Sequence, residues 1–109
     1  MSTDLETSLL EAVEEYVIYR HSDLNRFNVM GFDEDELERV KVNKDGNLVF
    51  SVENIHIAEK DEQDGETTFY VKATLFFHVT KGEQIEGSTD IYECYQEEAG
   101  EWIIEWYGS

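Results

Sequence analysis

The sequence predicts an α+β fold: an N-terminal helix and a short second helix packed on a curved antiparallel β-meander of about four to five strands. Two observations predict this class. Apolar residues recur every three or four positions before Arg20 and alternate with a period of two from Val40 onward. Short turns such as Asp64-Gly65 join the alternating segments, and no proline interrupts them. With 109 residues, 40% of them hydrophobic, we expect a single domain over residues 1–109.

The first helix is expected to run to about Arg20. Thr3 and Glu6 have the spacing of a capping box. The apolar residues that follow lie on one helical face: Leu5, Leu9, Val13, Tyr16 and Val17. Glutamates occupy the opposite face, and no basic residue occurs before Arg20 to pair with them. We therefore expect packing against the sheet to hold this helix.

A second, short helix is expected over Glu34 to Arg39. Asp33 and Glu36 repeat the capping-box spacing, and the acidic first turn suits the positive end of the helix dipole. Phe32 before the cap and Leu37 inside the helix match a hydrophobic staple, which supports the same helix start.

A β-hairpin is expected around the turn Asn43 to Gly46. The apolar residues that flank this turn alternate: Val40 and Val42 before it, and Leu48, Phe50 and Val52 after it. Ile55 and Ile57 are out of phase with these residues. A β-bulge near Glu53-Asn54 is the simplest explanation.

The longest alternation predicts the central strand. Six apolar residues share one face: Phe69, Val71, Ala73, Leu75, Phe77 and Val79. Such a strand spans ~33 Å and implies a twisted sheet whose hollow the first helix would fill. The polar segment before it, Asp61 to Glu66, is expected to be a loop.

The chain is expected to end in a hairpin formed by Ile85 to Glu97 and a last strand, joined at Ala99-Gly100. The preferred register places the large residues of the last strand toward the core, opposite Tyr92 and Cys94. These residues are Trp102, Ile104 and Trp106.

In this register Glu93 lies across from Glu105 and Glu97 across from Glu101, with all four carboxylates pointing outward. It requires a bulge near Ile91-Tyr92, because Ile91 is out of phase with Tyr92. The competing register would bury Glu93, which costs several kcal/mol unless the carboxylate is paired or protonated. We therefore favour the first register.

The sequence contains no catalytic, cofactor or metal motif. Cys94 is the single cysteine and is expected to be structural rather than nucleophilic. His21, His56 and His78 share no ligand-like spacing with one another or with Cys94. The core-facing positions of the clearest strands carry only apolar side chains, which leaves no general acid or base there. We expect neither an enzyme nor a bound cofactor or metal.

Negative charge is the one feature that points to a function. The chain has 26 Asp and Glu against 8 Lys and Arg, a net charge of −18, and eight acidic but no basic residues follow Lys81. Like charges opposed across antiparallel strands cost up to about 1 kcal/mol each. A basic protein partner would compensate them, whereas direct binding to DNA or RNA is disfavoured. A merely solvated acidic face is the other explanation.

The candidate partner-binding residues fall in two patches. The first is the C-terminal hairpin, with Glu86, Asp90, Glu93, Glu97, Glu101 and Glu105; the second, around the short helix, is Asp33, Glu34, Asp35 and Glu36. Large apolar side chains are expected beside the first patch, on the outer face of the sheet: Tyr70, Phe76, Ile103 and Tyr107. Exposed aromatics beside charge are typical of an interface. A second copy of the chain could also cover them, so a homodimer stays open.

One N-terminal helix followed by long bent strands that end in Trp102-Ile103-Ile104 resembles the cystatin-like and NTF2-like group. That resemblance implies a small-ligand or dimeric interaction module. In size and charge the chain resembles phage-encoded DNA mimics, such as anti-restriction and anti-CRISPR proteins, and the acidic immunity proteins of nuclease toxins. This second resemblance implies an inhibitor whose carboxylates replace phosphates at a nuclease or another DNA- or RNA-binding protein. We favour the inhibitor and keep the NTF2-like module as the alternative.

The expected location is the cytoplasm, without a membrane. No stretch approaches the ~20 apolar residues of a membrane span, and Met1 to Glu6 lacks the basic start and apolar run of a secretory signal. Halophilic adaptation is a third explanation of the acidity and predicts unfolding at low salt. The ordinary share of large apolar residues argues against it.

Overall fold

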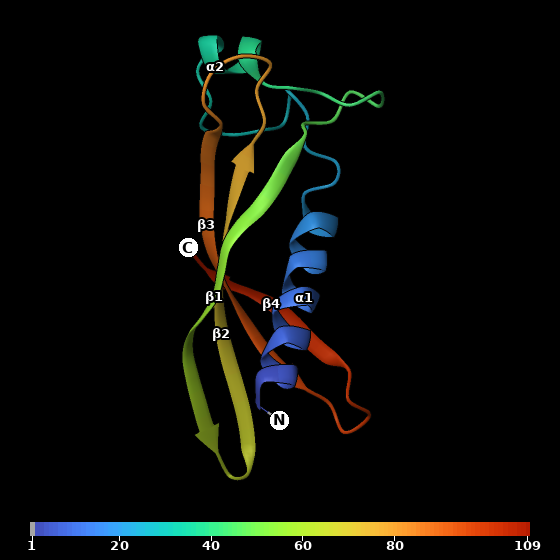
Figure 1. The fold of residues 1–109 in the computed structure, drawn as a ribbon, viewed down its shortest axis with the longest axis vertical. Helices are drawn as coiled ribbons and strands as arrows, with labels where there is room; N and C mark the ends of the chain where they lie inside the picture. Colours follow the sequence, from blue (N-terminus) through green and yellow to red (C-terminus); the bar gives the residue numbers. More distant parts are fainter. Residues whose placement is uncertain (1) are drawn as a thin grey trace.

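The computed structural model describes residues 2–109, with side chains from Asp4 onward. Two helices precede four strands: α1 (Ser2–Arg20), α2 (Glu34–Arg39), β1 (Phe50–Gln63), β2 (Glu66–Phe77), β3 (Ile85–Gln96) and β4 (Trp102–Gly108). The strands form one antiparallel sheet in the order β1-β2-β3-β4 (Figure 1). The α+β class with four strands is confirmed. No fifth strand occurs within residues 2–109, and the sheet is not closed.

The molecule is a rod. Its Cα extents are 50 × 23 × 23 Å and its radius of gyration is 15.9 Å, against about 13 Å for a compact chain of this length. The length comes from β1, β2 and β3, which have 14, 12 and 12 residues, because each strand residue adds about 3.3 Å. α1 lies along the same axis (Figure 1).

The core lies between α1 and the inner face of the sheet. Leu9, Val13 and Val17 of α1 are at most 2% exposed. β2 contributes five of the six alternating residues that the sequence predicts, and these five are buried: Phe69, Val71, Ala73, Leu75 and Phe77. The sixth, Val79, lies beyond the end of β2, is partly buried and forms an isolated bridge with Val40. Tyr92 and Cys94 of β3 complete this layer. The apolar face of one helix and one face of the sheet are therefore buried against each other.

Of the two predicted capping boxes, the second is confirmed. Asp33 Oδ1 accepts a hydrogen bond from the Glu36 amide at 2.8 Å, and Glu36 Oε1 accepts one from the Asp33 amide at 3.2 Å. α1 begins at Ser2, so Thr3 lies inside the helix, and the Thr3 side chain is outside the described part of the chain. α2 buries none of its residues. Contrary to our expectation, it lies at one end of the sheet instead of packing on a face (Figure 1).

The segment before β1 is less regular than predicted. The hairpin expected around Asn43–Gly46 is reduced to an isolated bridge between Val42 and Leu48, and the continuous strand begins at Phe50. The bulge near Glu53-Asn54 is confirmed, because the register shifts after Glu53 and Asn54 has φ 57°.

The polar stretch Asp61–Glu66 is not a loop. β1 continues to Gln63 and β2 begins at Glu66, joined by a two-residue turn at Asp64 (φ 51°) and Gly65 (φ 80°). These two positive φ values suit a tight hairpin turn. The pattern missed the strand because both of its faces are exposed here, which removes the hydrophobic alternation.

The register of the C-terminal hairpin is as predicted. Glu93 pairs with Glu105, and the Glu97 amide donates a hydrogen bond to the Glu101 carbonyl at 2.8 Å. The register does shift at Ile91/Tyr92, but the extra residue is Tyr107 of β4, so the bulge expected in β3 at this point is wrong. β3 alternates regularly here, and Ile85 comes into phase through a register shift between Glu86 and Thr89. The opposed glutamates of the hairpin are therefore a real feature of the fold.

Trp106 is a correction to the predicted core. It lies opposite Tyr92 on the inner face, but it is 50% exposed because it lies beside the last turn of α1 rather than beneath the helix. The Arg20 guanidinium lies 5.5 Å from its ring centroid. Trp102 and Ile104 are half-buried against the core.

Candidate acidic binding surface

Four glutamates of the β3–β4 hairpin form what we call the hairpin array: Glu93, Glu97, Glu101 and Glu105. Their backbone positions are fixed by the ladder, which pairs Glu93 with Glu105 and bonds Glu97 to Glu101. Glu93 is half-buried and the other three are exposed. The sheet thus holds two pairs of like charges across neighbouring strands, on a rigid scaffold.

Two tyrosines lie beside the half-buried glutamate. Tyr70 of β2 pairs with Glu93, and its hydroxyl donates a long hydrogen bond of 3.5 Å to Glu93 Oε2. The Tyr70 and Tyr107 rings meet edge to face with centroids 5.0 Å apart. Desolvation raises the pKa of Tyr70, and the Glu93 carboxylate raises it further. The phenol therefore stays protonated and available as a donor.

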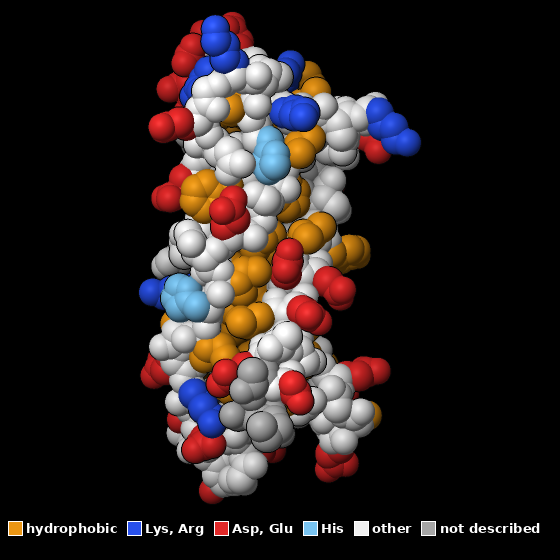
Figure 2. Space-filling view, viewed as in Figure 1, with side chains coloured by type: hydrophobic (Ala, Val, Ile, Leu, Met, Phe, Trp, Pro, Cys, Tyr) orange, Lys and Arg blue, Asp and Glu red, His pale blue; other side chains and the backbone are white. Residues whose placement is uncertain are grey.

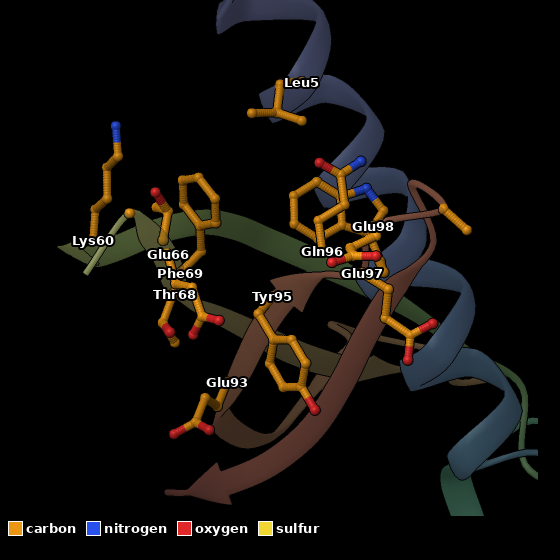
Figure 3. A pocket seen from close by; sticks show the side chains of 14 residues that line it. Leu5, Lys60, Glu66, Thr68, Phe69, Glu93, Tyr95, Gln96, Glu97 and Glu98 are labelled. Atoms are coloured by element: carbon orange, nitrogen blue, oxygen red, sulfur yellow. The ribbon is translucent and has the colours of Figure 1, made fainter. Parts of the chain in front are cut away.

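A hollow of about 1120 Å³ separates the ends of the two hairpins. Lys60, Glu66 and Phe69 line it from β1 and β2, and Glu97 and Glu98 line it from the β3–β4 turn (Figure 3). The hollow exists because β2 and β3 stop pairing at Thr68–Tyr95, after which the hairpins diverge. Four glutamates and one lysine are the charged residues among the fourteen that line it: Glu66, Glu93, Glu97, Glu98 and Lys60. Its walls therefore carry a net negative charge.

The protein neutralises few of its own carboxylates. Among the described residues, only two ion pairs join basic and acidic side chains: Arg39–Asp35 at 3.6 Å and Lys60–Glu62 at 3.4 Å. Neither pair includes the hairpin array or Glu86. Lys and Arg side chains gather at the end of the molecule that carries α2, and acidic ones dominate the opposite end (Figure 2).

Asp90 does not belong to this surface. It pairs with Ala73 on the inner face and is 8% exposed. Its carboxylate accepts hydrogen bonds from Trp106 Nε1 at 3.3 Å and from Ser88 Oγ at 3.2 Å. The sequence pattern placed Asp90 outward because a bulge expected in β3 at Ile91-Tyr92 would reverse the phase of the strand, whereas β3 alternates regularly from Thr89 to Tyr95 against β2.

The second acidic patch is separate and largely occupied. α2 lies at the opposite end of the rod from the β3–β4 turn (Figure 1). Asp33 and Glu36 cap the helix, and Asp35 pairs with Arg39. Only Glu34 lacks such a contact within the described residues, so this patch offers fewer free carboxylates than the hairpin array.

The four apolar residues predicted on the outer face do not form one cluster. Tyr70 and Tyr107 are in contact, and Ile103 belongs to the same face. Phe76 pairs with Glu86 farther along β2. Sequence reasoning missed Tyr95, which pairs with Ile103, is 39% exposed and also lines the hollow. Its position in the alternation Ile91, Glu93, Tyr95 was the available signal.

Other chemistry has little support in the described residues. Cys94 is fully buried, and burial raises its pKa to about 12, which makes it a poor nucleophile. Within residues 2–109, no three His, Cys, Asp or Glu side chains are placed to share a metal ion. Neither described helix has the length and apolar composition to cross a bilayer.

The fold and surface define an acidic α+β protein in which one long helix covers an open four-stranded meander. No family model matches this sequence, and comparisons with curated proteins and with solved structures found no match either. The functional argument therefore depends on geometry and charge.

Proposed function

We propose that this protein binds a basic macromolecule and inhibits it, with carboxylates in the place of nucleic-acid phosphates. The observation that carries the proposal is linear charge density. The 26 Asp and Glu residues and the 50 Å long axis give about one carboxylate per 1.9 Å, and the net charge of −18 gives about one net charge per 2.8 Å. Double-stranded DNA has one charge per ~1.7 Å. A groove lined with Lys and Arg would meet carboxylates on this rod at a density similar to that of phosphates.

The low number of internal ion pairs supports the same proposal. A carboxylate that is already paired gains little from a new cation, whereas an unpaired one gains Coulomb energy and speeds the encounter. Within residues 4–109 the hairpin array forms no ion pair, and the ladder holds it in fixed register. Its mutual repulsion would be relieved by a Lys/Arg-rich surface, such as the nucleic-acid cleft of a nuclease.

The alternative, an NTF2-like module, has less support. A ligand pocket between helix and sheet would need free space there, but Leu9, Val13 and Cys94 at that interface are completely buried. A homodimer through the outer face would bring Glu93 and Glu105 against the same residues of the second copy. That arrangement adds like charges where the patch is most apolar.

The test is charge reversal with a matched control. The first variant replaces Glu93, Glu97, Glu101 and Glu105 with Lys. The control replaces Asp4, Glu6, Glu11 and Glu14, exposed residues of α1, with Lys, so its net charge is the same. We expect the hairpin variant to lose capture of basic proteins from a lysate at least tenfold, and the control to lose much less.

Equal capture by both variants would contradict a specific role of the hairpin array. Undiminished capture by the hairpin variant, with affinity that stays flat as salt rises, would contradict the proposed function as a whole.

A further inference from the structure

β4 is an edge of the sheet with little of the usual protection. Charged side chains, bulges and prolines normally keep edge strands from pairing with another chain. β1, the opposite edge, has two register shifts and a charged run from Glu59 to Glu62. β4 carries one charged residue, Glu105, in the sequence Trp-Ile-Ile-Glu-Trp-Tyr-Gly. Its one bulge lies at Tyr107 near the end of the strand, so Trp102 to Trp106 run without interruption.

Alternate residues of β4 point their backbone groups away from the sheet. The Glu97 amide bonds the Glu101 carbonyl, and the same pairing continues through Glu93 and Glu105. In an antiparallel ladder the residues between such pairs face the other side. These residues are Trp102, Ile104 and Trp106. Within residues 2–109, no strand pairs with this edge.

An apolar groove of about 500 Å³ lies between this edge and α1. Its walls are Ala12, Tyr16 and Tyr19 from the helix and Trp102, Ile103 and Ile104 from β4, with Glu15 as the one charged residue. Tyr19 is 79% exposed, and its neighbour Ile18 is 45% exposed. Apolar surface beside unpaired backbone groups suits strand addition, in which the backbone supplies affinity and the groove supplies specificity.

We propose that an extended segment of a basic partner adds to the sheet as a fifth strand beside β4. Side chains of a strand alternate between its faces, so its apolar residues would enter the groove toward α1 and its basic residues would lie beside Glu105. Charge selects this occupant, because a second copy would add a net charge of −18 at the same edge. The inference rests on the proposed function for the partner's charge, but strand addition has its own test.

The probe is the peptide Lys-Val-Lys-Val-Lys-Val-Lys, added to the full chain, with backbone amide hydrogen exchange as the readout. We expect slower exchange at the amides of Trp102, Ile104 and Trp106. The exchange rates of the Ile103 and Glu105 amides should not change, since these amides already face β3. A peptide with all internal amides N-methylated keeps its charge but cannot donate hydrogen bonds, so it should bind at least tenfold more weakly.

Two variants distinguish the effect of the charge beside β4 from the effect of the protein's overall negative charge. Glu105→Gln should weaken peptide binding several-fold, whereas Glu59→Gln, the same change on the opposite edge strand, should leave it unchanged. Strand addition would be overturned if the N-methylated peptide bound as tightly as the unmodified one, or if exchange slowed equally at every amide of β4. Either result would leave the charge proposal standing. Concentration-dependent protection of the three amides without peptide would show that a second copy occupies the edge, and would overturn the chosen partner.

Discussion

Asp90 differs from the other acidic residues of β3 because its carboxylate is used inside the protein. It accepts hydrogen bonds from Trp106 and Ser88 and thereby ties β4 to β3. We expect Asp90→Ala to lower the free energy of unfolding by about 1–2 kcal/mol, since hydrogen bonds to a charged acceptor are lost but Trp106 can reach water. Urea unfolding measures the effect.

The matched control for Asp90 is Glu86→Ala on the same strand. Glu86 is exposed, so its replacement should change stability by less than about 0.5 kcal/mol. Partner capture that falls in Asp90→Ala without any loss of stability would show that Asp90 contacts the partner after all.

Cys94 and Tyr92 make the fold sensitive to alkali. Burial is the main cause that raises the pKa of Cys94 from 9.0 to about 12, and burial also raises the pKa of Tyr92 despite the nearby Arg20. The folded chain therefore holds protons that the unfolded chain releases above pH ~9. Stability should be unaffected by these two groups below that pH. It should fall as pH rises above it, by up to about 1.4 kcal/mol per pH unit for each group.

Urea unfolding at a series of pH values from neutral to strongly alkaline checks this dependence. Cys94→Ala should be less stable throughout but should show a shallower alkaline decline, because one of the two protons is gone. An identical slope in the variant would contradict the role of the thiol.

At the scale of the elements, β3 needs a glycine at position 87, where its pairing with β2 shifts register. A Cβ at position 87 would lie 2.6 Å from Phe77 Cε2 and 3.2 Å from the Leu75 carbonyl oxygen. Phe77 is buried and cannot move freely. We expect Gly87→Ala to cost about 1–3 kcal/mol by overpacking.

Gly108→Ala is the matched control in the same sheet. No atom lies within 4 Å of its added Cβ, so its cost should stay below about 0.5 kcal/mol. Tryptophan fluorescence during urea unfolding reports both. Equal stability of the two variants would mean that β3 shifts to accept the methyl group.

The sequence predicts elements well where one face is buried and poorly where both faces meet water. The alternation from Phe69 to Phe77 located β2, whereas the phase of Tyr92 against Ile91 placed a bulge in β3 that the structure has in β4. The strand continuation through Asp61 was missed because polar residues on both faces carry no periodic signal.

The candidate site was predictable only in part. The Glu93–Glu105 pairing followed from register alone. The burial of Asp90 depends on the indole of Trp106 from another strand, and the hollow depends on where two hairpins diverge. Such features come from contacts between distant segments, which local spacing does not encode.

At the scale of the whole molecule, charge acts on folding and on binding in opposite directions. A net charge of −18 with two ion pairs among the described residues leaves repulsion within the fold. The same repulsion is a source of free energy for association with a polycation. The buried core between α1 and the sheet must therefore offset the repulsion in the free protein.

We therefore expect added salt to stabilise the protein and to weaken its complex. Raising NaCl from about 20 to about 500 mM shortens the screening length from roughly 20 Å to roughly 4 Å. Thermal unfolding should move up by several degrees, since a gain of about 1 kcal/mol corresponds to about 4–8 °C in a domain near this size. Affinity for the basic partner should fall at least tenfold over the same range.

The α1 charge-reversal variant separates the two effects: it should gain less stability from salt but keep the steep loss of affinity, because its hairpin array is intact. Unfolding at low salt together with salt-independent binding would favour halophilic adaptation over an inhibitor.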